Sequence, residues 1–219
     1  MKPLIVINVK TYPTGTGPKL LRLAKLMETV KKETGSKIIL LVPATDIYPI
    51  SKAVNLPIYA QHADLATYGA NTGAILPESI KFAGAKGTIL NHAEKKIDHK
   101  IIKKTILTLK LKNLKSIVCA DTIEEVKKIA RFGPDIIAIE PPELIGGNHS
   151  VTKARPEIIT ETVKIVKRIN PSIKILVGAG IKTAYDIRKS MELGADGVLI
   201  ASGITGAKDP KKVLIDMLS

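Results

Sequence analysis

Tryptophan is absent from this sequence, and aromatic residues make up only 3% of its 219 residues. Hydrophobic residues still amount to 45%, so the core must be built mainly from aliphatic side chains. The chain also lacks an uninterrupted apolar run of ~18 or more residues, which a transmembrane helix requires. We therefore expect an aliphatic core and no membrane span. At this length the chain suits one large domain or two small ones.

Cysteine is nearly absent as well, because Cys119 is the only one. An internal disulfide is therefore impossible, and this cysteine usage favours a reducing cytoplasm. The first apolar run reaches Asn8 after a few residues, which is not the pattern of a signal peptide. We expect a cytoplasmic protein in which Cys119, at the end of an apolar run, packs in the core rather than acting as a nucleophile.

The net charge of +14 raises the question of a nucleic-acid partner. Its distribution argues against one, because the adjacent lysine pairs are scattered along the chain and no aromatic residues lie between them to stack on bases. The lysine pairs are Lys31-Lys32, Lys95-Lys96, Lys103-Lys104, Lys127-Lys128 and Lys211-Lys212. The positive charge favours small anionic substrates instead, by electrostatic steering.

Short apolar runs, rich in β-branched residues, recur along the whole chain. They are nearly continuous rather than alternating, which is typical of parallel strands buried on both faces. The runs are Leu4–Val9, Ile38–Val42, Ile58–Gln61, Thr88–Leu90, Ser116–Ala120, Ile136–Ile139, Ile173–Val177 and Gly197–Ile200.

Amphipathic segments of helical periodicity separate these runs. Apolar residues from Leu20 to Val30 share one helix face, and a second helix is predicted after a possible N-cap at Asp121-Thr122. Pro156–Ile169 begins with proline in its first turn, and Ala184–Leu193 ends at Gly194, a common helix stop. Eight strand–helix units therefore alternate along the chain.

This alternation predicts the α/β class and a single (β/α)8 barrel over residues 1–219. The length lies near the lower limit of ~200 residues for that fold, so the helices must be trimmed. The helical pattern is thinnest at residues 44–56 and 62–86. A doubly wound open sheet is the structural alternative. In a barrel, the chemistry belongs at the C-terminal ends of the strands.

One strand end carries a single carboxylate followed by two prolines. Glu140 follows the apolar run Ile136–Ile139, and Pro141 and Pro142 restrict the chain directly after it. The loop then becomes flexible at Gly146-Gly147. This pattern is typical of a general base attached to a mobile lid, although an ordinary turn would explain Glu140 if it stood alone.

Two other strand ends carry polar residues that could act with such a base. Strand alternation places Asn8 and Lys10 on the same, inward-facing side. Asn91 could cap a short helix and put His92 in its first turn, where the helix dipole keeps the imidazole neutral. Glu94 is available to pair with Lys10 or Lys95. A solvated lysine and a structural histidine are the alternatives.

The last two strands are followed by loops of small residues. The segments after them are Gly178-Ala179-Gly180 and Ala201-Ser202-Gly203, and each opens a helix. Their backbone N–H groups can face a phosphate, which is the usual phosphate site of a barrel. These loops predict phosphate binding without specifying a reaction. The remaining histidines, His62, His99 and His149, do not form a ligand set for a metal.

Taken together, these motifs resemble triosephosphate isomerase in order and spacing, over essentially the whole chain. The resemblance is closest to the short archaeal form of that family. It rests on Asn8-x-Lys10, Asn91-His92-x-Glu94, the lid at 140–146, the two small loops, and a third loop at 60–62 and 69–73 like the one that packs into a partner subunit in this family.

The resemblance implies interconversion of dihydroxyacetone phosphate and D-glyceraldehyde 3-phosphate through an enediolate. Glu140 would be the base, Lys10 the cation, His92 the proton donor and Asn8 the residue that orients the substrate carbonyl. It implies no metal and no organic cofactor. The implied substrate-binding residues are Asn8, Lys10, Ile145, Gly146, Gly178, Gly180, Ala201 and Ser202.

The resemblance also implies a homo-oligomer, with a tetramer favoured and a dimer as the alternative. The sequence departs from the commoner family pattern at Val9 and at Pro142-Glu143, and the seventh loop lacks the usual tyrosine and serine hydroxyls that latch the lid. Two rival functions are another sugar-phosphate barrel enzyme and a phosphate-binding protein without catalysis. An assay for turnover separates catalysis from mere binding.

Overall fold

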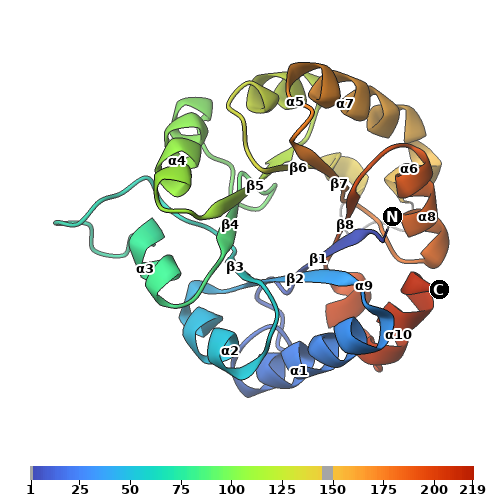
Figure 1. The fold of residues 1–219 in the computed structure, drawn as a ribbon, viewed down its shortest axis with the longest axis horizontal. Helices are drawn as coiled ribbons and strands as arrows, with labels where there is room; N and C mark the ends of the chain where they lie inside the picture. The colour runs from blue at the N-terminus through green and yellow to red at the C-terminus, as the bar shows by residue number, and fades with distance from the viewer. Residues whose placement is uncertain (1, 145–149) are drawn as a thin grey trace.

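The computed structural model describes residues 2–144 and 150–219, and its eight parallel strands close into a barrel in chain order (Figure 1). The predicted barrel is thus confirmed, and the open sheet is not formed. The strands are β1 (Leu4–Asn8), β2 (Lys37–Val42), β3 (Ile58–Ala60), β4 (Gly87–Leu90), β5 (Lys115–Ala120), β6 (Ile136–Ile139), β7 (Lys174–Val177) and β8 (Gly197–Ile200).

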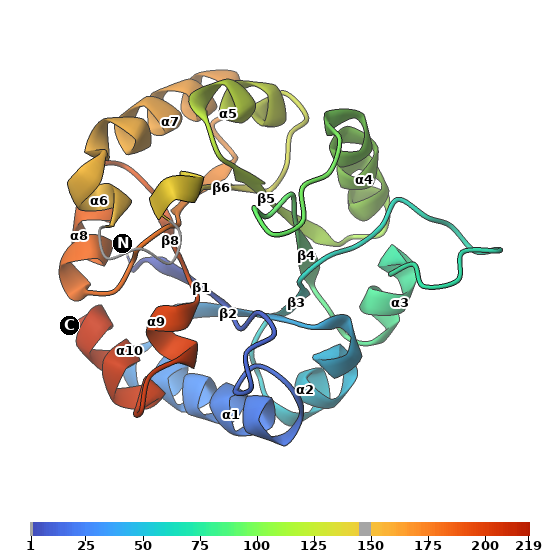
Figure 2. The same cartoon turned by 180° about the vertical axis from the view of Figure 1, so that it is seen from behind.

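Helices surround the barrel in an outer ring (Figures 1 and 2). The α-helices are α1 (Gly17–Thr34), α2 (Ile47–Ala53), α3 (Pro77–Phe82), α4 (His99–Leu111), α5 (Ile123–Ala130), α6 (Val151–Ala154), α7 (Pro156–Ile169), α8 (Ala184–Glu192), α9 (Ser202–Thr205) and α10 (Pro210–Leu218). Two 3-10 turns are η1 (Ala44–Asp46) and η2 (Pro142–Leu144).

The regions with the weakest helical pattern contain the shortest outer elements. Residues 44–56 hold η1 and α2, and residues 62–86 hold only the six-residue α3. Residues 61–76 form a long connection without helix or strand, which projects from the barrel between β3 and α3 (Figures 1 and 2). The trimming expected from the chain length is therefore concentrated on this side of the barrel.

The aliphatic core has two parts, because each strand is buried on both faces. Side chains such as Val6, Leu41, Ile117 and Leu176 fill the barrel interior. The alternate residues, such as Ile5, pack outward against the helices. This arrangement explains why the apolar runs are continuous rather than alternating.

Local side-chain caps fix where several helices begin. The Thr122 hydroxyl accepts a hydrogen bond from the Glu125 N–H, which confirms the predicted N-cap of α5. Thr183 and Asp186 form a reciprocal capping box at the start of α8. Gly194 ends that helix region with φ of 94°, a conformation that glycine tolerates.

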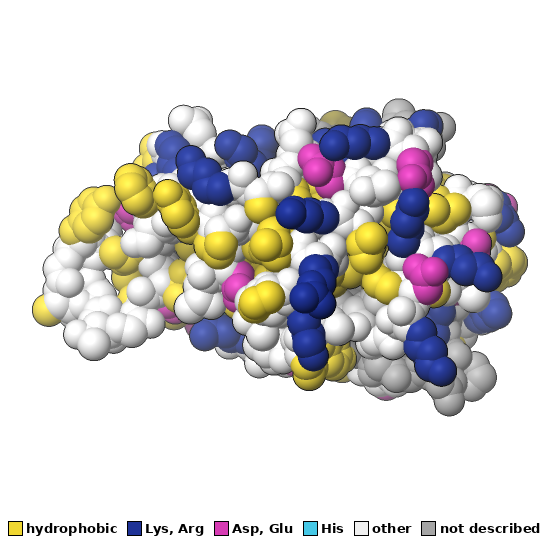
Figure 3. All heavy atoms as spheres, turned by 90° about the horizontal axis from the view of Figure 1, so that it is seen from below, with side chains coloured by type: hydrophobic (Ala, Val, Ile, Leu, Met, Phe, Trp, Pro, Cys, Tyr) yellow, Lys and Arg dark blue, Asp and Glu magenta, His cyan; other side chains and the backbone are white. Residues whose placement is uncertain are grey.

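The surface charge and the helix lengths bear on possible partners. Lys and Arg side chains are spread across the face seen in Figure 3 rather than gathered in one patch. Among the helices of residues 2–144 and 150–219, none has the length and apolar character to cross a membrane.

Because all strands are parallel, their C-terminal ends open on the same rim of the barrel, where polar residues follow β1, β4 and β6.

Candidate active site

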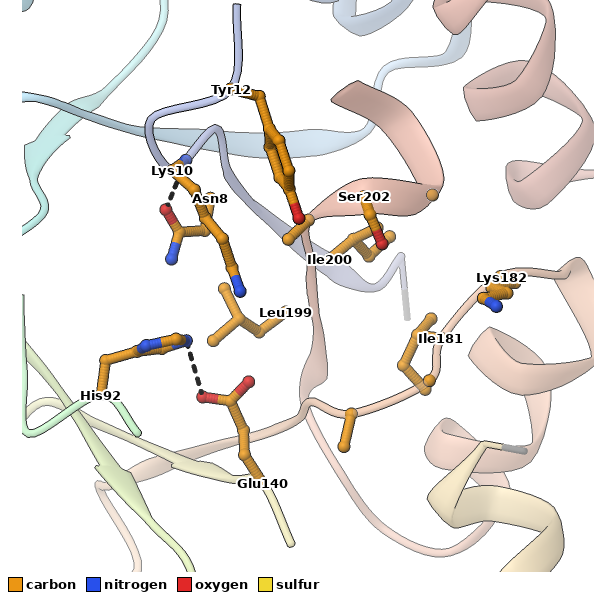
Figure 4. Close-up of a pocket in the computed structure, with 14 residues that line it drawn as sticks. Asn8, Lys10, Tyr12, His92, Glu140, Ile181, Lys182, Leu199, Ile200 and Ser202 are labelled. Carbon is orange, nitrogen blue, oxygen red and sulfur yellow. Dashed lines mark hydrogen bonds and ion pairs between the residues drawn. The ribbon is translucent and has the colours of Figure 1, made fainter. Parts of the chain in front are cut away.

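A pocket at this rim brings together residues predicted at five strand ends, those of β1, β4, β6, β7 and β8 (Figure 4). Its lining residues are Asn8, Lys10, Tyr12, His92, Glu140, Ala179, Gly180, Ile181, Lys182, Leu199, Ile200, Ala201, Ser202 and Gly203. Seven of the predicted site residues are among them: Asn8, Lys10, His92, Glu140, Gly180, Ala201 and Ser202.

Glu140 lies directly after β6 and is 5% exposed. Its N–H donates to the Ala120 carbonyl at 2.9 Å, which continues the pairing with β5 beyond the strand. Burial raises the pKa of the carboxyl group, and nearby His92 and Lys10 oppose that shift. The Oε2 atom is buried without a hydrogen-bond partner in the described part of the chain. A carboxylate in this state is a stronger base than one in water.

Cys119 packs against this carboxylate from inside the barrel. Its side chain is completely buried, and burial raises the pKa of the thiol well above its ordinary value, with the Glu140 carboxylate adding to the effect. The group therefore stays a thiol and can donate a hydrogen bond to Glu140. This environment agrees with the predicted packing role.

His92 faces Glu140 across the pocket, with its Nε2 atom 3.9 Å from the Oε2 atom of Glu140 (Figure 4). The Nδ1 atom accepts a hydrogen bond from the Glu94 N–H at 3.2 Å. This bond assigns the ring proton to Nε2, the atom that points into the pocket. The imidazole is thus oriented as a donor toward the space beside Glu140.

The short helix expected after Asn91 is not formed, and that prediction is wrong. His92 instead opens a turn, in which the Lys95 N–H donates to its carbonyl at 2.8 Å, and α4 begins only at His99. The backbone donor of Glu94, rather than a helix dipole, selects the tautomer of the His92 ring.

Asn91 stabilises this turn through side-chain hydrogen bonds. It has φ of 58°, a left-handed conformation that asparagine tolerates better than most residues. Its side-chain amide donates to the Cys119 carbonyl at 2.9 Å and to Glu125 Oε1 at 2.8 Å, and its oxygen accepts from the Ile97 N–H at 3.2 Å. The buried Asn91 amide therefore links the His92 turn to β5 and α5.

Lys10 is directed into the pocket by a turn after β1, not by the strand alternation that the sequence predicts. Asn8 is the last residue of β1, and Lys10 lies beyond the strand with φ of 49°. The Asn8 Oδ1 atom accepts from the Lys10 N–H at 3.0 Å and from Gln61 Nε2 at 3.2 Å. The turn therefore directs Lys10 inward, and its ammonium group pairs with Glu94 at 2.6 Å, one of the predicted pairings.

The loops after β7 and β8 supply backbone donors at the other side of the pocket. Ala179 and Gly180 have φ of 64° and 74°, so two consecutive residues take the left-handed conformation. Asp186 holds the loop by accepting from the Lys182 and Thr183 N–H groups at 3.1 and 3.0 Å. The first N–H groups of α9, which begins at Ser202, have no intrahelical acceptor and suit an anion.

Gly178 packs against Glu140 rather than lining the phosphate side of the pocket, which its sequence motif does not predict. It does not line the pocket, and its N–H donates to the Ile139 carbonyl at 3.0 Å within the sheet. A Cβ atom on Gly178 would lie 2.6 Å from Glu140 Oε1 and 2.7 Å from Glu140 Cδ. The missing side chain of Gly178 makes room for the Glu140 carboxylate.

The lid can be followed only at its two ends. Ile145 and Gly146, which the resemblance assigns to substrate binding, lie outside the described residues. On the N-terminal side, the prolines lead into the η2 turn at Pro142–Leu144. On the C-terminal side, Thr152 donates to Asp186 Oδ1 at 2.8 Å and the Val151 N–H donates to the Ala179 carbonyl at 3.3 Å, so this end is attached to α8 and to the loop after β7.

His62 and His99 have structural partners, and His149 lies outside the described residues. His62 pairs with Asp64 at 2.9 Å within the projecting connection, and His99 lies 3.4 Å from Glu125. Over residues 2–144 and 150–219, His, Cys, Asp and Glu side chains do not gather in a group of three or more that could hold a metal.

Several pocket residues were not singled out from the sequence. Tyr12, Leu199 and Ile200 line the wall together with Ile181 and Lys182. The one available signal was the position of Tyr12, two residues beyond Lys10 in the same loop. The apolar residues gave no signal, because they look like any other strand residues.

Comparison with known proteins identifies the family. The family model described as triosephosphate isomerase matches residues 3–218. The chain is 44% identical over 218 residues to the triosephosphate isomerase of Methanothermus fervidus, covering 100% of this chain and 98% of that protein. It is 46% identical to that of Saccharolobus solfataricus, covering 99% and 95% of the two chains. The resemblance read from the strand ends is thereby confirmed, and the chain belongs to the triosephosphate isomerase family.

Proposed function

We propose that Glu140, His92, Lys10 and Asn8 carry the reaction of this family, the interconversion of dihydroxyacetone phosphate and D-glyceraldehyde 3-phosphate. Glu140 takes a proton from the carbon beside the carbonyl group and returns it to the neighbouring carbon. Its burial and its raised pKa support this role, because a desolvated carboxylate holds a proton more strongly.

The negative charge of the enediolate develops on oxygen and needs donors that are already in place. His92 Nε2–H faces this oxygen and moves a proton between the two oxygens of the substrate. Lys10 supplies positive charge, and its partner Glu94 is 59% exposed at the rim, so the ammonium group can turn toward a bound anion. Asn8 fixes the Lys10 backbone through its Oδ1 atom.

The phosphate group is bound by the backbone of Gly180, Ala201 and Ser202, with Ile145 and Gly146 contributing from the lid. The left-handed Gly180 and the N-terminus of α9 support this assignment. Closure of the lid over the pocket excludes water, so the enediolate is reprotonated rather than losing phosphate. All of these steps use side chains and backbone groups alone.

The observation that carries the assignment is the distance of 3.9 Å between His92 Nε2 and Glu140 Oε2, with the Lys10 side chain in the same pocket. The test is Glu140→Asp, which keeps the charge and retracts the carboxylate. We expect at least a 100-fold loss of kcat, because a displacement of about 1 Å costs roughly that factor. Glu157→Asp, at an exposed position on α7, is the matched control.

His92 is tested separately by His92→Gln. We expect a large loss of kcat with little change in KM, since the histidine acts mainly on the charge that develops during the reaction. An unchanged kcat would remove His92 from the mechanism, and near-normal activity of Glu140→Asp would remove Glu140 as the base.

The family assembles as oligomers, and we propose a homotetramer for this chain, with a dimer as the alternative. On the projecting connection Tyr68 is 77% exposed, and on α4 Leu107 is 51% exposed and Leu111 is 86% exposed. Two separate apolar surfaces support two kinds of subunit contact. Light scattering tests this, with a mass four times that of the chain expected and a twofold mass indicating the dimer.

We also propose that the protein acts in the cytoplasm, in glycolysis and gluconeogenesis. The single buried thiol of Cys119 supports this compartment, because it can form no internal disulfide. Cell fractionation tests the location, and recovery of the activity in a membrane or extracellular fraction would contradict it.

A further inference from the structure

Tyr12 is the one polar side chain of the pocket's first loop that the proposed mechanism does not use. It lies two residues beyond Lys10 and lines the same pocket as His92, Glu140 and Ser202. In Figure 4 its ring extends into the pocket, and its hydroxyl points toward the wall formed by Ile200 and Ser202. Tyr12 therefore lies on the side where the loops after β7 and β8 offer their backbone donors.

The loop that carries Tyr12 is held in place by its neighbours. The Thr14 hydroxyl donates to the Thr205 carbonyl at 2.8 Å, which attaches the loop to α9. The Gly15 N–H donates to the Tyr12 carbonyl at 2.7 Å. A Cβ atom on Gly15 would lie 2.5 Å from the Val9 carbonyl oxygen, so this tight turn requires glycine. The ring is thus positioned by backbone contacts rather than by its own hydroxyl.

The hydroxyl of Tyr12 is available for a ligand. Within residues 2–144 and 150–219 it makes no hydrogen bond, and the residue is 39% exposed, so a ligand can reach it. A tyrosine hydroxyl can donate one hydrogen bond, so it can serve a ligand that enters the pocket. Here the free donor lies beside the backbone groups suited to a phosphate, which has several oxygens to satisfy.

The chemistry of the seventh loop strengthens this reading. The position after Gly180 holds Ile181, an apolar side chain that offers no hydroxyl to an anion. Ser202 and Tyr12 are the two residues with hydroxyl groups among those that line the pocket in the described part of the chain. Tyr12 approaches from β1, the strand adjacent to β8 in the closed barrel, and so from the side opposite the seventh loop.

We propose that Tyr12 is a further substrate-binding residue, whose hydroxyl donates a hydrogen bond to the phosphate group of the triose phosphate. It thereby contributes to the preference for phosphorylated over unphosphorylated trioses. This inference rests on the proposed function of the pocket. It assigns no proton transfer to Tyr12, because Glu140 and His92 already serve the reacting carbons and oxygens.

The test compares two substrates in the Tyr12→Phe variant, which removes the hydroxyl and keeps the ring. With D-glyceraldehyde 3-phosphate we expect kcat/KM to fall by about 10-fold or more, the effect of one hydrogen bond to a charged group. With D-glyceraldehyde, which lacks the phosphate, we expect no change from the unsubstituted protein. Tyr48→Phe is the matched control, at an exposed tyrosine on α2 outside the pocket.

A second measurement uses inorganic phosphate as a competitive inhibitor. Its inhibition constant should rise about 10-fold in Tyr12→Phe and remain unchanged in Tyr48→Phe. Equal losses with both substrates, or no loss with either, would overturn the inference, as would an unchanged inhibition constant. Failure of the proposed function itself would be distinct, because the unsubstituted protein would then isomerise neither triose.

Discussion

Replacing Gly178 by alanine tests whether the glycine after β7 makes room for Glu140, the proposed catalytic base. Gly178 lacks a positive φ, so the backbone accepts alanine and any effect comes from packing. The new methyl group would lie 2.6 Å from Glu140 Oε1 and 2.7 Å from Glu140 Cδ. Since carbon contacts normally lie at about 3.5–4 Å, the carboxylate must retreat by about 1 Å.

A displacement of this size predicts a kcat loss of about 100-fold with D-glyceraldehyde 3-phosphate. Overpacking should also lower the free energy of unfolding by about 1–3 kcal/mol, which urea denaturation measures. The combination with Glu140→Ala sharpens the test, because alanine lacks the Cγ and carboxylate atoms that the new methyl group would meet. In that background Gly178→Ala should lower the free energy of unfolding only slightly.

The refuting result is simple to recognise. A Gly178→Ala variant with kcat close to that of the unsubstituted protein would mean that the carboxylate position does not depend on this glycine. Full additivity of Gly178→Ala and Glu140→Ala in the free energy of unfolding would point to the same conclusion, because it would show that the two positions act independently.

Two further predictions concern stability. Burial raises the pKa of Glu140, so the folded protein binds more protons than the unfolded chain between the unfolded pKa near 4.5 and the raised folded value. The contribution of Glu140 to stability is therefore largest below pH 4.5 and is lost as the pH rises. At pH 7, Glu140→Gln should melt at a higher temperature than the unsubstituted protein. A lower melting temperature would contradict this. Asn91→Gly keeps the left-handed backbone but removes three hydrogen bonds, so the free energy of unfolding measured by urea denaturation should fall by about 3 kcal/mol. An unchanged urea midpoint would mean that the Asn91 amide does not secure the His92 turn.

The strands and the main residues of the candidate site could be predicted because their signals are local. Each strand is a short apolar run; Asn8 ends β1, Glu140 follows β6 directly, and His92 lies two residues after β4. In a parallel barrel all such ends share one rim, so topology alone brings them together. Helix α7 was predicted at its observed bounds because proline marks its start.

The details that escaped prediction depend on contacts between distant segments. Lys10 enters the pocket through a left-handed turn, whereas strand alternation was the expected cause. His92 is oriented by a backbone donor in a turn that Asn91 ties to β5, and no local pattern encodes that bond. Gly178 looked like a phosphate-loop glycine, and only its distance to Glu140 shows what its missing side chain accommodates.

The closing contact of the barrel has a consequence for how the protein is made. Strand β1 pairs with β8, so Lys10 lines the same pocket as residues that are synthesised almost last, such as Ser202. A chain emerging from the ribosome therefore contains Lys10, His92 and Glu140 before it contains the proposed phosphate-binding residues after β8. Contacts between such distant segments also slow folding. The enzyme should accordingly gain activity in a single late step, when the eighth strand closes the ring.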